Sequence, residues 1–424
     1  MEITQLSSGV TSRFIQSNRF KTTMISICFY LPLCKDTVSV EALIPKVMTV
    51  ESPEYKDFSE INRRLDSLYG ATLSTSVDKL GDLHEIRFSV SALSDRYTLE
   101  DSGALIGATE LLTELLFSQY LSGQKYSDGV LVREKRLLSE EIKSEINEKR
   151  RYARQRCEQE MCKSEPFGLP AHGYVEGVEA IDNGFLYKQI EIMLKSAYAN
   201  IQITGEKMPD GILETFKQSF SKIQRDYHPL NKDVIKSAQP LETVIEKMDV
   251  KQGKLVMGLR SSAVGNDEQS IGTMVMGDLF GGGPYSKLFC NVREKMSLCY
   301  YCSARPVRRK GLIFVESGVE KVNTERAKEE IVNQFNAVKN GDFTNENLEE
   351  SIRSLSDTVK SVSDDLSSLD RWYSTRTFEQ NPLSPEEFAK KISFVTAEEV
   401  KESANSFTLD TVYIIEPKED SENE

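Results

Sequence analysis

Apolar positions in the first half of the chain change repeatedly between a pattern typical of strands and one typical of helices. The run from Met24 to Cys34 is almost continuously apolar, as in a buried strand. By contrast, Ile61, Leu65 and Leu68 recur at the spacing of one helix face. The predicted elements are, in order, strand 22–34, helices 36–48 and 57–69, strands 71–77 and 84–90, helices 103–121 and from about 128, helix 185–195, strand 199–204 and a helix to about 225.

The second half of the chain repeats this order of elements. The helix that ends at Ser67-Leu68 and leads into a strand has a counterpart that ends at Ser297-Leu298. The shared order predicts an α+β fold of two homologous lobes, each a mostly antiparallel sheet covered by helices. The second set comprises strand 254–260, helices 268–279 and 287–295, strands 299–304 and 312–317, helices 324–339 and 345–375, two short helices with capping boxes at Ser384 and Thr396, and strand 411–415.

The boundary between the two predicted lobes lies where Pro229 and Pro240 interrupt the pattern. Beyond the last strand the chain is acidic and poor in apolar residues, which is typical of disorder. The predicted domains are an N-terminal lobe over 1–228, a linker over 229–245, a C-terminal lobe over 246–416 and a disordered acidic tail over 417–424.

Composition and charge then narrow the class of protein. The 424 residues carry 53 basic and 66 acidic side chains, a formal net charge of −13, and contain no basic tract. This balance argues against binding to nucleic acid or to an anionic membrane surface. No signal-peptide pattern begins the chain, and no apolar run approaches the roughly 18 residues of a membrane span. Seven cysteines are too few and odd in number for a disulfide framework, so we expect a cytoplasmic protein.

Histidine is the first test for a metal site, and the chain has only His84, His172 and His228. A zinc hydrolase needs two or three imidazoles that converge, often four residues apart on a helix. None of the three lies within five residues of another, so we expect ordinary surface or loop histidines and no metal site.

Cys299 and Cys302 have the C-x-x-C spacing of redox and zinc motifs. They fall in a predicted strand, where residues three apart face opposite sides of the sheet, so we expect them not to meet. Cys157 and Cys162, five apart in a predicted helix, are also off the three-or-four spacing of one helix face. Thiol chemistry is therefore not expected.

The glycine run Gly281-Gly282-Gly283, followed by Pro284, lacks the Lys and Ser or Thr of a phosphate-binding loop. It closes a predicted helix, whose C-terminal end carries partial negative charge and repels phosphate. Two interpretations stay open: the run ends the helix, or its missing side chains let the backbone of an extended peptide approach closely.

The segment around this run resembles the C-terminal lobe of the insulinase-like metallopeptidases. It reads Phe280-Gly-Gly-Gly-Pro-Tyr-Ser-Lys-Leu-Phe289, then Val292-Arg-Glu-Lys295 and Leu298-Cys-Tyr300. The family includes pitrilysin and the mitochondrial processing peptidases, and its zinc motif is the inverted H-x-x-E-H. Its second lobe carries an arginine followed seven residues later by a tyrosine, and Arg293 and Tyr300 have that spacing.

The first lobe departs from the family pattern. Where the zinc motif is expected, residues 42–48 read Ala-Leu-Ile-Pro-Lys-Val-Met, without either histidine or the glutamate. Downstream, Glu141 matches the third zinc ligand of the family and Glu134 its supporting carboxylate. A single carboxylate cannot hold catalytic zinc, so these are possible remnants of a lost site, and we expect them on a solvated helix surface. No cofactor is expected in this chain, which alone should not hydrolyse peptides.

The resemblance implies a role for such a zinc-less chain. Some bacterial members are heterodimers of a zinc-bearing chain and a zinc-less chain that carries the Arg/Tyr pair, and the two close as a clamshell around unfolded or short peptides. This sequence resembles the zinc-less partner chain, as found in the YmfF-like proteins of Gram-positive bacteria. By this resemblance, Tyr300 would stabilise the oxyanion and Arg293 would hold a substrate carbonyl, while Gly281, Gly282 and Gly283 would contact the peptide and a partner chain would supply zinc.

Two other functions remain to be weighed. A peptide-binding or scaffold protein of the same fold would have lost the chemistry altogether, and a complex containing it would show no cleavage that depends on Arg293. A self-sufficient cysteine enzyme would show thiol-sensitive activity as the isolated chain.

Overall fold

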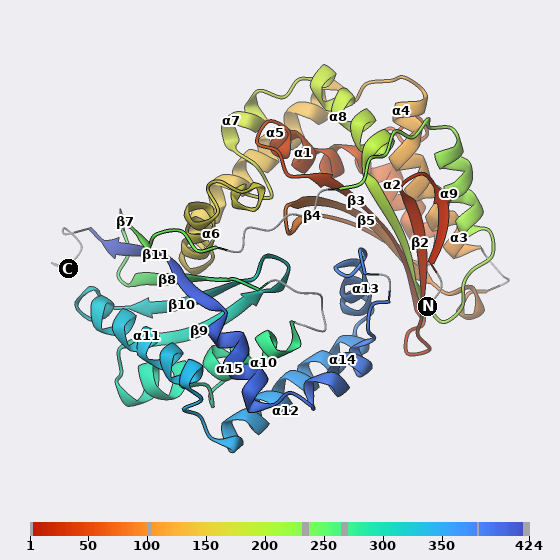
Figure 1. Ribbon diagram of the computed structural model, residues 1–424. Helices are drawn as coiled ribbons and strands as arrows, with labels where there is room; N and C mark the ends of the chain where they lie inside the picture. Colours follow the sequence, from red (N-terminus) through yellow and green to blue (C-terminus); the bar gives the residue numbers. More distant parts are fainter. Residues whose placement is uncertain (1–2, 100–102, 231–236, 264–269, 380, 419–424) are drawn as a thin grey trace. The chain divides into compact units, whose positions relative to one another are not determined.

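The computed structural model describes residues 3–99, 103–230, 237–263, 270–379 and 381–418. The chain forms two compact units, each built on one sheet (Figure 1). The first unit comprises Met1–Ser144, Glu165–Lys232 and Val362–Pro382, and the second comprises Glu145–Ser164, Asp233–Ser361 and Leu383–Glu424.

The sheet of the first unit has six strands in the order β1-β2-β6-β3-β5-β4. All neighbours are antiparallel except β2 and β6, which are parallel. β3 is buried along almost its whole length, as its apolar run predicts. The strands are β1 (Ile3–Ser7), β2 (Val10–Gln16), β3 (Thr22–Pro32), β4 (Thr72–Leu80), β5 (Leu83–Leu93) and β6 (Tyr198–Gly205).

The sheet of the second unit has the order β7-β11-β8-β10-β9, again with a single parallel pair, β7 and β11. This order reproduces β2-β6-β3-β5-β4 of the first unit strand for strand and direction for direction. The predicted α+β class, with two homologous, mostly antiparallel sheets, is therefore confirmed. The strands are β7 (Glu242–Met248), β8 (Gly253–Ser261), β9 (Cys299–Val307), β10 (Leu312–Val319) and β11 (Phe407–Pro417).

Helices cover one face of the first sheet and bury most of its apolar side chains. Leu111 and Leu112 of α3 join Phe88 of β5 and Ile201 of β6 in one continuous core. These helices are α1 (Val38–Met48), α2 (Phe58–Ser67), α3 (Ala104–Thr113), α4 (Gln119–Leu121), α5 (Asp128–Ser144), α7 (Val175–Glu179), α8 (Asn183–Ser196) and α9 (Ile212–Ser221). The predicted helix 103–121 is interrupted by a π-helical turn over Glu114–Ser118.

The second unit carries its own set of helices on its sheet. Ser384 and Thr396 form the two predicted capping boxes, with Glu387 and Glu399 respectively. The helices are α10 (Ile271–Gly281), a π-helix over Leu288–Lys295, α11 (Thr324–Asn340), α12 (Asn345–Ser361), α14 (Pro385–Ile392) and α15 (Ala397–Asn405). The predicted tail lies outside the described residues from 419 onward, and so do residues 231–236 of the predicted linker and 268–269 of a predicted helix.

Two helices are exchanged between the halves of the sequence. α6 (Lys149–Met161) packs on β8 and β11 of the second unit, and α13 (Leu366–Ser374) packs on β6 and β3 of the first. Each follows a 17-residue helix and a short 3₁₀ turn. The predicted single helix 345–375 is wrong, because the chain turns at 362–364 and Asp365 caps a new helix by accepting from Ser368 N. Each unit is therefore discontinuous in the sequence.

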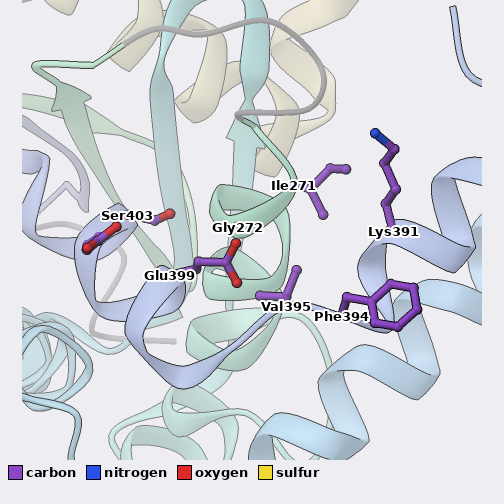
Figure 2. Close-up of a pocket in the computed structure, with 8 residues that line it drawn as sticks. Ile271, Gly272, Lys391, Phe394, Val395, Glu399 and Ser403 are labelled. Carbon is purple, nitrogen blue, oxygen red and sulfur yellow. The ribbon is translucent and has the colours of Figure 1, made fainter.

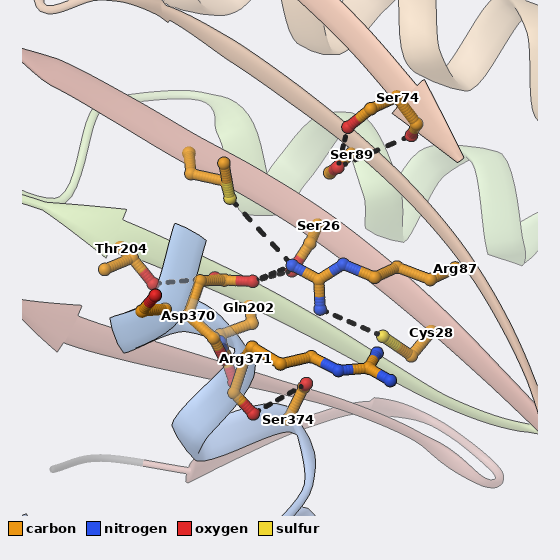
Figure 3. Close-up of polar contacts among 12 residues, drawn as sticks. Ser26, Cys28, Ser74, Arg87, Ser89, Gln202, Thr204, Asp370, Arg371 and Ser374 are labelled. Atoms are coloured by element: carbon orange, nitrogen blue, oxygen red, sulfur yellow. Dashed lines mark hydrogen bonds and ion pairs between the residues drawn. The ribbon is translucent and has the colours of Figure 1, made fainter. Parts of the chain in front are cut away.

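A buried charge anchors α13 on the first sheet (Figure 3). Asp370 is fully buried, pairs with Arg87 of β5 and accepts hydrogen bonds from Thr204 Oγ1 at 2.7 Å and Ser26 Oγ at 3.0 Å. Burial lowers the pKa of Arg87, but the Asp370 carboxylate more than offsets this and raises the pKa above its ordinary value. The Arg87 guanidinium therefore stays charged inside the unit.

Candidate functional site

The first place to look for chemistry is the helix that carries zinc ligands in the insulinase-like family. In this chain the segment 42–48 lies in α1, where Pro45 stands within the helix and Lys46 points to α5. Lys46 Nζ lies 2.7 Å from Glu141 Oε2, so an ammonium group occupies one side of the carboxylate that matches the family's third ligand. His172 Nε2 lies 3.9 Å from the other oxygen of Glu141.

A second cluster of hydrogen-bonded polar side chains lies beside α1, around His84. This histidine is completely buried, with Nδ1 at 2.6 Å from Glu41 Oε2 and Nε2 at 2.9 Å from the Ala171 carbonyl. Gln189 donates to the other oxygen of Glu41 at 2.7 Å. The expectation of a surface or loop histidine is wrong for His84, because it lies on the buried strand β5.

Glu134 also departs from the expectation of a solvated helix surface. It is only 6% exposed and accepts a hydrogen bond from Arg133 Nε at 2.8 Å. Catalytic zinc needs about three converging protein ligands, and Glu141 is already paired with the positive charge of Lys46. No cluster of three His, Cys, Asp or Glu suited to a metal occurs within the described residues. The side chains of the first unit therefore do not fit catalytic zinc.

Arg293 of the second unit lies on the π-helix Leu288–Lys295, and its side chain is 41% exposed. The guanidinium lies over the ring of Phe289, with Cζ 4.5 Å from the ring centroid, and Nε lies 3.5 Å from Glu294 Oε1. The five-residue hydrogen-bond spacing of a π-helix is rare and is frequently found at functional sites. Stacking fixes the plane of the guanidinium while leaving donors available to another molecule.

Tyr300 lies at the start of β9, the outermost strand of the second sheet, and is 62% exposed. In the pairing with β10, Cys299 lies opposite Val319 and Tyr301 opposite Gly318, so Tyr300 is the extra residue of a β-bulge. Its hydroxyl donates to Glu320 Oε1 at 3.1 Å. That hydrogen bond and the negative charge of Glu320 raise the pKa of Tyr300, so the phenol remains a donor at neutral pH.

A backbone turn joins the π-helix that carries Arg293 to the strand that carries Tyr300. Leu298 N donates to Val292 O at 3.1 Å, which folds the start of β9 back onto the π-helix. Ser297, within this turn, adopts a positive φ of 49°, which is uncommon for a residue other than glycine. Three irregular features thus follow each other along 288–300: a π-helix, a left-handed residue and a bulge. Such features concentrate at functional sites.

The glycines of the run 281–283 have different surroundings. A Cβ on Gly281 would lie 2.5 Å from Ala304 N, so the backbone that approaches this glycine is that of β9. Gly277, one helical turn earlier, is equally close to Pro306 of the same strand. Gly281 is buried and allows α10 to lie directly on the strand that carries Tyr300, whereas Gly282 is exposed.

The expected separation of Cys299 and Cys302 is wrong. Because Tyr300 is an unpaired bulge residue, the alternation of side chains is interrupted between the two cysteines, and both are buried. The register places both side chains on the same face of β9, opposite Val319 and Ser317, and the interaction between the two thiols lowers the pKa of Cys299 and raises the pKa of Cys302. The strand itself was predicted correctly; the extra residue could not be seen without knowing how β9 pairs with β10.

Three contacts were not predicted from the sequence: Lys46 to Glu141, Glu320 to Tyr300, and the stacking of Phe289 on Arg293. Only Lys46 carried a signal, since a lysine inside the segment that replaces a metal motif is a ready substitute for the cation. Glu320 is one charge among many at the end of a strand, and its role depends on the bulge.

A groove of about 440 Å³ elsewhere in the second unit contains none of the predicted site residues (Figure 2). It lies between α10 and the α14–α15 turn, where Phe394 is 70% exposed. Its lining is Ile271, Gly272, Lys391, Phe394, Val395, Glu399, Glu402 and Ser403.

The helices of the described residues include none with the length and apolar composition of a membrane span.

Comparison with known proteins places this geometry in a family. Residues 184–355 match the model described as "Peptidase M16 inactive domain". The "Probable inactive metalloprotease YmfF" of Bacillus subtilis (strain 168) is 31% identical over 419 residues, covering 99% of this chain and 98% of that protein. A conserved protein from Enterococcus faecalis V583 superposes with a TM-score of 0.91 at 25% identity, covering 100% of this chain and 99% of its own. A protease from Helicobacter pylori shares the fold at a TM-score of 0.79 and 13% identity, covering 98% and 99%.

Proposed function

Because the chain belongs to the M16 metallopeptidase family and lacks its zinc motif, we propose that it is the zinc-less partner subunit of a heterodimeric zinc peptidase. In this proposal a homologous, zinc-bearing chain supplies the metal, and this chain supplies Arg293 and Tyr300. The complex cleaves unfolded or short peptides. We place it in the cytoplasm, in keeping with an acidic chain that has few cysteines.

The observation that carries the proposal is the exposed position of Tyr300 on an irregular backbone, in a chain whose first unit has lost the zinc motif. Lys46 and Glu141 pair with each other in the first unit. In the second, Tyr300 is 62% exposed on an irregular backbone. A large aromatic side chain held in this way at a sheet edge, with a polar tip, is suited to contact another molecule.

Tyr300 would act as a hydrogen-bond donor to developing negative charge. The zinc of the partner chain would provide an activated water, whose attack places negative charge on the peptide carbonyl oxygen. The phenol is protonated at neutral pH, as a tyrosine with the ordinary pKa of about 10 already is, and Glu320 raises this pKa further. The hydroxyl can therefore transfer its hydrogen bond from Glu320 to the oxyanion. A donor that is already oriented costs little reorganisation at the moment of reaction.

Arg293 would hold the substrate rather than take part in proton transfer. Its guanidinium is planar, always charged and stacked on Phe289, which limits the side-chain entropy lost on binding. Such a group can hold a peptide carbonyl in one register and align the scissile bond with Tyr300. β9 is the outermost strand of its sheet, so its free edge can pair with an extended peptide. Gly282 and Gly283 would border such a peptide, whereas Gly281 would act through the position of β9.

The experiment is a kinetic comparison of the reconstituted complex with its zinc-bearing partner. Changing Tyr300→Phe should lower kcat about a hundredfold, the usual effect of losing one oxyanion donor. Changing Arg293→Lys keeps the charge but removes the planar fork, so kcat/KM should fall about tenfold, mainly through KM.

Tyr97→Phe is the matched control, because it removes a hydroxyl from another exposed tyrosine, in the first unit. Its kcat should equal that of the unchanged complex. Equal kcat for Tyr300→Phe and Tyr97→Phe would remove Tyr300 from the mechanism.

The alternative is a peptide-binding or scaffold protein of the same fold. The pairing of Lys46 with Glu141 favours this alternative, because the zinc site of the first unit has been lost. Cleavage by the assembled complex that depends on Arg293 separates the two functions. A complex that binds peptide but never cleaves it would support the scaffold role.

A further inference from the structure

The C-x-x-C pair of β9 is not used by the proposed peptidase function, and its arrangement calls for a role of its own. Cys299 lies opposite Val319 and Cys302 opposite Ser317, with the bulged Tyr300 between them. A strand with one extra residue changes the side to which its later side chains point. The bulge therefore brings together two sulfurs that a regular strand would separate.

The two thiols are chemically unequal. The Cys302 thiol donates a hydrogen bond to the Cys299 sulfur and lowers the pKa of Cys299 to about 7, against the opposing effect of burial. The Ser317 hydroxyl and the positive charge of Arg293 act in the same direction. The hydrogen bond to Cys299, followed by burial, raises the pKa of Cys302 well above its ordinary value. This pairing of a thiolate with a neighbouring thiol is typical of reactive dithiols.

The other cysteines of the chain lack this combination. Burial raises the pKa of Cys28 to about 12 and raises the pKa of Cys157 as well. Cys290 is exposed, and partial burial together with Glu350 raises its pKa too. Cys34 is exposed and Cys162 is buried beside Arg260. Cys299 and Cys302 are thus distinguished by their places on one face of β9, on either side of the bulge, and by the lowered pKa of Cys299.

We propose that Cys299 and Cys302 form a peroxide-reactive dithiol that closes to a disulfide across the bulge at Tyr300. The Cys299 thiolate attacks one oxygen of hydrogen peroxide, the O–O bond breaks, and the leaving hydroxide takes up a proton to become water. The Cys302 sulfur then attacks the resulting sulfenic acid at Cys299 and displaces hydroxide, which leaves as water with the proton that Cys302 gives up. Two thiols and one peroxide become one disulfide and two waters.

Closing this bond has a structural consequence at the exposed end of β9. A disulfide holds its sulfurs about 2.05 Å apart, far closer than a hydrogen bond does, so the bulge must tighten. The residues inside the ring that forms are Tyr300 and Tyr301. Oxidation therefore moves Tyr300 away from its hydrogen bond with Glu320. Peroxide is small enough to reach Cys299, which is 9% exposed.

The test is a mass-spectrometric thiol map of the full chain treated with hydrogen peroxide at pH 7. Trypsin should release fragment 296–308, which contains both cysteines, and fragment 157–163, which contains Cys157 and Cys162 as a matched control pair. After denaturation and alkylation, fragment 296–308 should lose both alkylation sites and become two hydrogens lighter, and dithiothreitol should restore both sites. Fragment 157–163 should remain doubly alkylated.

A substitution separates the two steps. In Cys302→Ala, which removes both the second sulfur and the hydrogen-bond donor, Cys299 should stop at a sulfenic acid that dimedone traps, and the pH midpoint for its alkylation should rise from about 7. At pH 7 alkylation of Cys299 should then slow on the order of tenfold, in step with its smaller thiolate fraction. The proposal is overturned if fragment 296–308 keeps two free thiols while Cys290 is oxidised, or if both fragments close equally. Neither result depends on peptidase activity, so this inference can fail while the proposed function stands.

Discussion

The two units of the chain share one order of five strands but differ in the backbone that carries their candidate polar residues. In the first unit, charged and polar groups near the lost metal motif satisfy one another: Lys46 pairs with Glu141, and Glu41 holds His84. In the second, Arg293 and Tyr300 remain exposed on a backbone with a π-helix and a bulge. Two copies of one fold can therefore differ in which of their polar side chains pair inside the unit and which stand on its surface.

The exchanged helices add a second contrast between the units. α13 reaches the first sheet through Asp370, which is entirely buried with Arg87. α6 reaches the second through Arg150, which is 38% exposed and pairs with the buried Glu316 at 2.7 Å. α13 thus contributes a fully buried carboxylate to its pair, whereas α6 contributes a guanidinium that water partly screens. A buried guanidinium also reaches α6 from its own sheet, because Arg260, which pairs with Asp410, donates to Met161 O at 3.2 Å.

The largest expected effect comes from breaking the buried pair of the first unit. Asp370→Ala leaves the guanidinium of Arg87 buried without its carboxylate, so the free energy of unfolding should fall by about 3–5 kcal/mol. Calorimetric unfolding and hydrogen exchange in β3, β5 and β6 would measure the loss.

The matched control for this change is Asp364→Ala, which removes a carboxylate that is 67% exposed and pairs with Arg19. Its effect should stay within about 1 kcal/mol. Equal losses in the free energy of unfolding for the two substitutions would mean that the buried pair of Asp370 stabilises the first unit no more than an exposed ion pair does.

An intermediate effect should follow from filling the contact between α10 and β9 in the second unit. A methyl group at Gly281 would meet Ala304 N at 2.5 Å, so Gly281→Ala should destabilise the chain by about 1–3 kcal/mol. Thermal unfolding would measure this. Gly129→Ala, in α5 of the first unit, has nothing within 4 Å of the added methyl and should be neutral or slightly stabilising. An unchanged melting temperature for Gly281→Ala would contradict the close packing of α10 on β9.

The smallest effect is expected at the lost metal site. Lys46→Met removes an ion pair whose side chains are 29% and 42% exposed, so stability should fall by less than about 1 kcal/mol, and less still at high salt. Chelation should leave the melting temperature of the unaltered chain unchanged. A drop on adding chelator would show that the first unit holds a metal after all.

The sequence predicted most of this fold because periodicity is a local property. Strands β3, β5, β8 and β10 and both capping boxes were found from spacing alone. Strands β1, β2 and β7 were missed; β7 has a half-polar pattern and falls partly within the predicted linker. The exchange of α6 and α13 could not be predicted, because it depends on which sheet each helix contacts after a short 3₁₀ turn.

The candidate site was predictable to a similar degree. Arg293 and Tyr300 could be chosen from their spacing and the surrounding segment, and both lie exposed near the start of β9. The bulge at Tyr300 was hidden, since it is defined only by pairing with β10. One unpaired residue therefore accounts for the wrong expectation that Cys299 and Cys302 lie apart.

The central claim is that this chain completes an active site in a second, zinc-bearing chain. A native mass spectrum of the tagged chain recovered from its own cells tests it most directly. The account predicts a heterodimer with a homologous chain of similar mass and one bound zinc per pair. A zinc-free monomer or homodimer would contradict it and leave the binding or scaffold role.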